Sequence, residues 1–162
     1  MEPMDDETLH DALQAHRAIE DDGDTYTVST AALDNEIAVA YGELVVTVTM
    51  PSLEEIVADD DPADVVVEGW FDGLKPHLLD ADSVTSYELV AEPSVAHGST
   101  DVEATYRLAG DDAELLVSDA KAIVDYVVGS YLQSAIPGYE YDDPMRGLLG
   151  KARERGRSDV QS

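Results

Sequence analysis

The N-terminal third of the chain changes from a helical to an alternating pattern of apolar residues. Over residues 5–20 a helical spacing is kept by Leu9, Ala12, Leu13 and Ile19, and acidic residues stand at the start, where the helix dipole favours them. This pattern predicts a helix that ends at the acidic turn 21–24. Three segments rich in β-branched residues follow, and their alternating faces and short breaks predict strands joined by hairpins over residues 25–31, 36–41 and 44–50.

The middle of the chain predicts two short helical stretches and then two strands. Ser52 and Glu55 fit a capping box, which predicts a helix beginning after Pro51. An acidic run interrupts that helix, and a second stretch reaches about residue 79, with a kink or break expected near Pro76 because proline lacks a backbone N–H. Alternation then predicts strands at 83–91 and 101–108, joined by a loop over 92–100.

The strongest helical pattern covers residues 113–135, where apolar residues keep one face until Pro137-Gly138. A last short helix is expected within residues 143–156. The order α-β-β-β-α-β-β-α predicts an α+β fold, a two-layer sandwich in which helices pack on one face of a five-stranded antiparallel sheet. We expect a single domain over residues 1–141 and a basic C-terminal tail over residues 142–162.

The net charge of the chain indicates the salt content of its environment and does not affect the predicted fold. The chain has 36 acidic and 9 basic residues, for a net charge of −27, far above the magnitude of about 2–8 that suits a small domain in ordinary buffer. The acids are spread along the chain, whereas residues 146–162 carry +3 and leave −30 for the rest. Because molar salt shortens the Debye length to about 3 Å, we expect a protein of a halophilic, potassium-rich cytoplasm.

The remaining composition narrows the class of protein. The chain has no cysteine, which excludes disulfides and thiolate metal sites. The acidic N-terminus lacks the apolar segment of a signal peptide, and no apolar run approaches the roughly 18 residues of a membrane span. We therefore expect a cytoplasmic protein without membrane contact.

Two resemblances follow from these observations. Over about residues 5–135 the element order resembles the type III secretion chaperone-like fold, which implies a dimer that binds another protein. The acidic composition, the Thr-Met-Pro-Ser-Leu-Glu-Glu junction at 49–55 and the Ile-Pro-Gly-Tyr-Glu-Tyr segment at 136–141 resemble a small uncharacterised protein family of haloarchaea. Such a family implies no activity and no functional residues.

The sequence contains no pattern that predicts catalysis or metal binding. His10 and His16 are six residues apart, so on a helix they point about 120° away from one another. The Gly-x-Ser-x-Gly elbow and the glycine-rich phosphate loops are absent. In so acidic a chain, a run such as Asp59-Asp60-Asp61 is expected to be a solvated turn. We predict no catalytic residue, no cofactor and no metal.

Two features of the sequence are stronger candidates for a binding role than the histidines and acidic runs. Trp70 and Phe71 are adjacent large aromatic residues in a chain with few; one of them is expected in the core, and the pair is alternatively a partner-binding patch. The basic tail is either a solvated end or a handle for an acidic partner. The candidate partner-binding residues are Trp70, Phe71, Arg146, Lys151, Arg153, Arg155 and Arg157.

Three functions remain open at this stage. The leading hypothesis is a non-enzymatic protein-interaction module, chaperone-like or an adaptor, that binds a protein partner or forms a homodimer. The first alternative is a small enzyme whose site combines carboxylates with His97 or tyrosines. The second is a nucleic-acid-associated regulator that acts through residues 146–157. A nucleic-acid partner is not expected, because a body of net charge −30 would repel phosphates.

Overall fold

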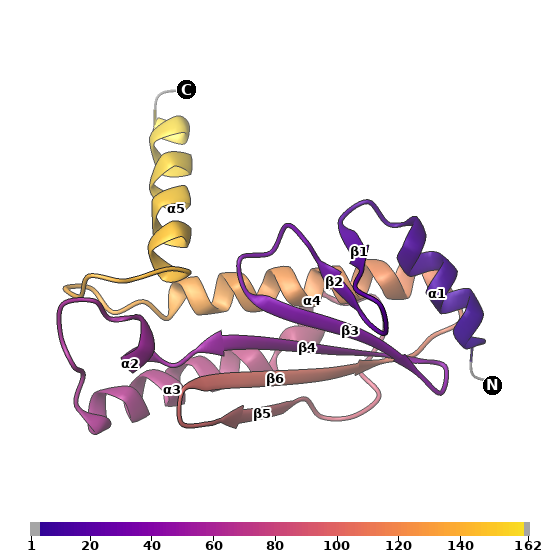
Figure 1. The fold of residues 1–162 in the computed structure, drawn as a ribbon, viewed down its shortest axis with the longest axis horizontal. Coiled ribbons are helices and arrows are strands. Elements are labelled where there is room, and N and C mark those ends of the chain that lie inside the picture. Colours follow the sequence, from indigo (N-terminus) through magenta and orange to yellow (C-terminus); the bar gives the residue numbers. More distant parts are fainter. Residues whose placement is uncertain (1–3, 161–162) are drawn as a thin grey trace.

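The computed structural model describes residues 4–160, with side chains described as far as Glu154. The helices are α1 (Asp6–Ala15), α2 (Leu53–Ile56), α3 (Asp64–Leu79), α4 (Ala113–Gln133) and α5 (Met145–Val160), and the 3₁₀ turn η1 covers Ala81–Val84. The strands are β1 (Ile19–Asp21), β2 (Tyr26–Val28), β3 (Asp34–Ala40), β4 (Glu43–Pro51), β5 (Ser94–His97) and β6 (Asp101–Leu108). Within residues 4–160 these strands form one sheet in the order β1-β2-β3-β4-β6-β5 (Figure 1). Each strand is antiparallel to its neighbours.

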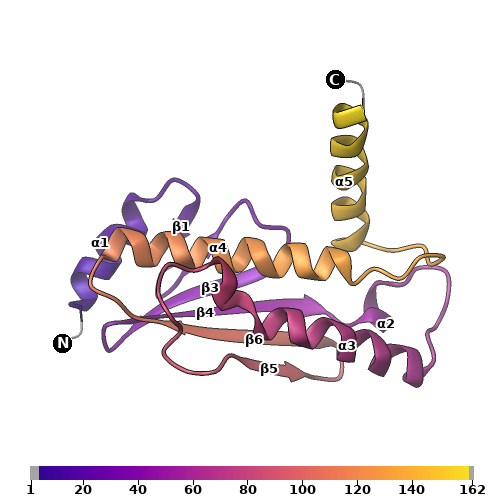
Figure 2. The same ribbon diagram turned by 180° about the vertical axis from the view of Figure 1, so that it is seen from behind.

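The two central strands, β4 and β6, show why the sheet is covered on one side. In both strands every even-numbered side chain is buried, and the odd-numbered ones are partly or fully exposed. This period of two places one face of each strand against the core. The helices α3 and α4 lie over that face, in front of the sheet in Figure 2 and behind it in Figure 1. The α+β class and the antiparallel sheet predicted from the sequence are therefore confirmed.

The sheet has six strands, so the prediction of five is wrong. The first helix ends at Ala15, and His16 and Ala18 turn the chain: the His16 amide bonds the Leu13 carbonyl, and the Ala18 amide bonds His16 Nδ1. Ile19, whose spacing had suggested a longer helix, begins β1 instead. The Ile19 side chain is buried, as expected, but it belongs to a strand. The spacing of a single apolar residue after a helix does not distinguish a further helical turn from a short strand.

The strand predicted at 83–91 is also wrong, and the strand β5 lies where a loop had been expected. The carboxylate of Asp119 accepts the backbone amides of Ser86 and Tyr87 at 2.8 and 3.1 Å, and the Val90 amide bonds the Arg107 carbonyl. Because these amides have acceptors already, the segment does not need a ladder of strand hydrogen bonds. The edge position beside β6 goes to Ser94–His97.

Two predicted helix boundaries differ in detail. Ser52 stands at the N-cap of α2, but its side chain makes no capping bond. Pro76 does not end α3, which continues to Leu79; only a few residues follow the proline, so few helical hydrogen bonds depend on it. None of the helices within residues 4–160 is both long and apolar enough to cross a membrane.

Candidate functional site

The C-terminal helix α5 is the part of the molecule that stands apart from the body. In both views it projects beyond the end of α4, while the other helices lie along the sheet (Figures 1 and 2). Met145 and Leu148, in its first turn, are buried. All four residues from Lys151 to Glu154 are exposed. The helix is therefore anchored by its foot and has its basic part in solvent.

A short segment, residues 136–142, fixes the position of this foot. The Asp142 amide bonds the Ile56 carbonyl at 2.7 Å, and the Ala58 amide bonds the Glu140 carbonyl at 2.8 Å. The Tyr141 hydroxyl accepts the Ile136 amide at 2.7 Å and donates to the Ile136 carbonyl at 3.0 Å. Burial raises the pKa of this hydroxyl, because the phenolate would lose its water. Tyr141 therefore stays a neutral donor and holds the segment closed.

A groove of about 520 Å³ lies between this segment and α5. Arg146 and Arg153 are seven residues apart, two helical turns, so both reach the groove from the same face of α5. Tyr139 and Tyr141 contribute aromatic surface on the opposite side, with their rings 6.4 Å apart edge to face. The groove is lined by Ala58, Tyr139, Glu140, Tyr141, Asp142, Arg146, Leu149, Gly150 and Arg153.

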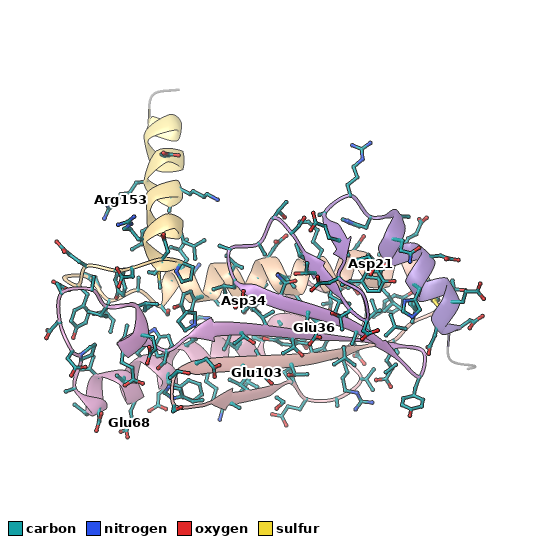
Figure 3. All side chains as sticks on the ribbon, in the orientation of Figure 1. Asp21, Asp34, Glu36, Glu68, Glu103 and Arg153 are labelled. Atoms are coloured by element: carbon teal, nitrogen blue, oxygen red, sulfur yellow. The ribbon has the colours of Figure 1, made fainter. Side chains whose placement is uncertain are left out.

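The arginines of this groove carry no ion pair with any described side chain. Among the residues whose side chains are described, the ion pairs are Arg107–Glu43 and Lys121–Asp125. In a chain with 36 acidic residues, two arginines on one helix face without a carboxylate partner are free to bind an external anion. Figure 3 shows Arg153 on α5, away from the acidic surface of the body.

The other predicted basic residues lie around the same helix. Lys151 lines a second groove, of about 370 Å³, on another side of α5 against the loop Thr30–Ala32 and α4. Arg155 and Arg157 belong to α5, but their side chains lie outside the described part of the chain. The expected division between a domain at 1–141 and a tail at 142–162 stays a prediction, although Met145 and Leu148 pack into the body.

Of the adjacent aromatic residues, Trp70 lies in the core and Phe71 lies at the edge of the core. Trp70 is buried, with 5% of its surface exposed, and its indole N–H donates to Ser134 Oγ at 3.0 Å. Phe71 is half-buried and stacks on His97 with ring centroids 4.5 Å apart. Trp70 therefore offers little surface to a partner. Of the two residues, Phe71 is the one whose side chain a partner could contact.

The structure brings together one pair that the sequence did not connect. Ser52 Oγ lies 3.0 Å from His97 Nε2. Nucleophilic catalysis requires a serine that substrate can reach and a histidine oriented by a third group. Ser52 has no exposed surface, its amide bonds the Thr100 carbonyl, and no hydrogen bond among described residues joins His97 to a carboxylate. The pair therefore ties β5 to the start of α2. Local patterns could not indicate this pair, because residues 92–100 were expected to form a loop.

A third groove, of about 440 Å³, lies between α3 and α4 and is lined mainly by small and apolar residues. Gly69 and Gly73 leave it open, since a Cβ added at either glycine would meet no atom within 4 Å. Among the described residues, no three His, Asp or Glu side chains gather where they could hold one metal ion. Asp59 Oδ1 instead accepts the Glu140 amide at 3.0 Å, so it helps to hold the foot of α5.

Comparison with known proteins adds one finding. The model of a family of unknown function (DUF5813) matches residues 10–151, which include the whole sheet, Arg146 and Lys151. No curated protein matches the chain. The predicted resemblance to an uncharacterised family is thus confirmed, whereas haloarchaeal origin and a chaperone-like fold stay predictions.

Proposed function

The chain belongs to this family of unknown function, DUF5813, and we propose from its structure that it is a non-enzymatic protein-interaction module of a potassium-rich cytoplasm. Its docking element is α5, with the groove at its foot. Its partner is a protein with an acidic surface. Because the family assigns no activity, the proposal rests on the geometry and charge of the chain itself.

The observation that carries this proposal is a basic helix that projects from an acidic body. The 16 residues of α5 extend over about 24 Å. An isolated helix of that length is marginal in water, and Gly147 and Gly150 weaken it further. Beyond the anchored first turn, α5 gains stability from a surface that pairs with its arginines. A helix of this kind is typical of a segment that binds another protein.

The two alternatives are less well supported by the described residues. For a small enzyme, the serine–histidine pair that the fold assembles has its serine where no substrate reaches it. For a nucleic-acid regulator, a helix of net charge +3 belongs to a body of net charge −30. The body would repel a nucleic acid that extends beyond α5, and high salt weakens phosphate contacts steeply. A protein surface needs only local charge complementarity.

Binding of a labelled poly-L-glutamate of about eight residues, which spans about 27 Å when extended and so can lie along α5 alone, tests the proposal. In about 1 M KCl the Debye length is about 3 Å, so only direct ion pairs persist. We expect the full chain to bind the peptide, as measured by fluorescence anisotropy. The double variant Arg146→Glu/Arg153→Glu should bind at least about tenfold more weakly, a loss of about 1.4 kcal/mol.

A charge-matched variant and a shortened chain make the result specific. Arg17→Glu together with Lys75→Glu changes the net charge equally at exposed positions away from α5, and it should leave binding unchanged. A chain ending at Gly150, which keeps the buried Met145 and Leu148 but lacks Arg153, should bind more weakly than the full chain. Equal weakening by the control pair would contradict docking through α5. Tighter binding of a single-stranded oligonucleotide than of poly-L-glutamate would favour the nucleic-acid regulator instead.

A further inference from the structure

We propose that the acidic surface on which α5 docks is the open face of the sheet in a second copy of this chain. This inference rests on the proposed function and names its partner. Each copy would place its α5 on the sheet of the other, so that one contact is repeated twice about a two-fold axis, as in most homodimers.

One whole face of the sheet is available for such a contact. The helices α3 and α4 cover the opposite face, and Figure 1 looks onto a face over which no helix of residues 4–160 lies. On β4 this face presents Val45, Thr47 and Thr49, all only partly exposed because their neighbouring strands flank them. Opposite them on β3 and β6 stand Ala38 and Thr105, while Arg107, paired with Glu43, stands opposite Val45 at one end. The centre of the face is therefore flat and built of small side chains, a surface against which a helix can pack.

Three carboxylates surround this centre. Asp34 and Glu36 are exposed on β3, and Glu103 is exposed on β6 (Figure 3). The strand register places Asp34 opposite Thr49, and Thr49 opposite Glu103. Asp34 and Glu103 are thus separated by two strand spacings, about 9.6 Å. None of the three acids forms an ion pair with a described side chain.

The basic face of α5 has the matching dimension. Arg146 and Arg153 are seven residues apart, which corresponds to about 10.5 Å along a helix. A helix that crosses the strands can therefore set one arginine on Glu103 and the other on Asp34. Leu149 and Gly150, between the arginines, then lie over Thr49. Glycine has no side chain, so Gly150 lets the helix backbone come close to the sheet.

The sheet face must come from another copy, because α5 cannot reach the face in its own chain. Both views show α5 extending beyond the body, alongside the sheet rather than over that face. Its foot is fixed by the buried side chains of Met145 and Leu148 and by the hydrogen bond from the Asp142 amide to Ile56. Folding α5 back would break these contacts. A second copy supplies the same open face without any rearrangement.

A charge exchange between two variants tests this inference. The helix variant is Arg146→Glu/Arg153→Glu, and the sheet variant is Asp34→Lys/Glu103→Lys. We expect the wild-type chain to be a dimer by light scattering coupled to size exclusion in about 1 M KCl, where only close ion pairs survive. Each variant alone should be a monomer. An equimolar mixture should form a heterodimer, because acidic helix then meets basic sheet and basic helix meets acidic sheet.

The controls separate charge at this interface from charge in general. The pair Glu68→Lys/Glu114→Lys changes exposed acids on α3 and α4, on the other side of the sheet, and should remain a dimer. Since all the substituted side chains are exposed, circular dichroism should show unchanged folding in every variant. Failure of the mixture to associate would overturn the inference, as would dimers of either variant alone.

The result also separates this inference from the proposed function. A monomeric wild-type chain that binds poly-L-glutamate through α5 would overturn the homodimer and leave the interaction module standing, with a different acidic protein as partner. A monomer that binds no poly-L-glutamate would overturn both. A dimer that persists in the helix variant would place the interface elsewhere and reject α5 as its docking element.

Discussion

At the scale of single residues, the side chain of Asp119 accepts backbone amides that would otherwise need partners in a neighbouring strand. It is the charged residue that is buried among the described residues, with 3% of its surface exposed. Both of its carboxylate oxygens accept backbone amides of the segment after η1, from Ser86 and Tyr87. A buried carboxylate is tolerated only when such bonds replace its water. Asp119 therefore determines the path of residues 85–93 across α4.

Replacement of Asp119 tests this role. Asp119→Ala should lower the free energy of unfolding by about 2–4 kcal/mol, because two partly buried amides lose a charged acceptor. Asp119→Asn keeps one acceptor oxygen and should lose roughly half as much. Urea unfolding at constant salt measures both. A loss below about 0.5 kcal/mol for Asp119→Ala, the range of ordinary surface substitutions, would contradict the role.

At the scale of elements, glycines mark where segments approach one another and where they do not. A Cβ added to Gly110 would lie 2.6–2.8 Å from the ring of Tyr87, so the segment around Tyr87 packs directly on the turn after β6. The Tyr87 hydroxyl reinforces this contact by donating to Asp111 and accepting the Asp112 amide. In contrast, Gly73 in α3 borders the groove toward α4 and has open space at its Cβ position.

Alanine at these two positions should have opposite effects. Gly73→Ala should raise the free energy of unfolding by about 0.5–1 kcal/mol, because alanine restricts the unfolded chain and fits a helix interior. Gly110→Ala should lower it by about 1–3 kcal/mol, because the aromatic ring must move. Chemical denaturation of the two variants gives both values. A destabilising Gly73→Ala would show that the α3–α4 groove closes more tightly than its geometry indicates.

At the scale of the whole molecule, the acidic surface is not neutralised internally. The ion pairs between described side chains are Arg107–Glu43 and Lys121–Asp125, against a net charge of −27. The repulsion among the acids must be screened by solvent ions, since so few cationic side chains are available. This need for screening is the physical reason to expect that the protein works in a salt-rich cytoplasm.

Stability should therefore depend on salt. Lowering KCl from about 1 M to about 0.1 M lengthens the Debye length from about 3 to about 10 Å and restores repulsion over the surface. We expect the midpoint of thermal unfolding, followed by circular dichroism, to fall on this change. Restoring osmolality with an uncharged solute should not recover the midpoint to the same extent. A midpoint independent of KCl would contradict adaptation to salt.

Local patterns accounted for much of the fold but little of the candidate site. The alternation at residues 44–50 and 101–108 identified β4 and β6, and the apolar stripe at 113–135 identified α4. Arg146 and Arg153 were recognised as basic residues on one segment. That they share a groove with Tyr139 and Tyr141, without a carboxylate partner, follows from the direction in which residues 136–142 leave the body.

The sequence by itself determined the class of fold, the buried faces of the central elements and the contrast between acidic body and basic end, because each depends on residue type and on neighbours within a few positions. The tertiary structure alone decided that Ile19 begins a strand, that Ser52 pairs with His97 and that Asp119 replaces the strand predicted at 83–91. These outcomes depend on which distant group satisfies a given amide or hydroxyl. That choice is made between residues 33 or 45 positions apart, far beyond the range of any local period.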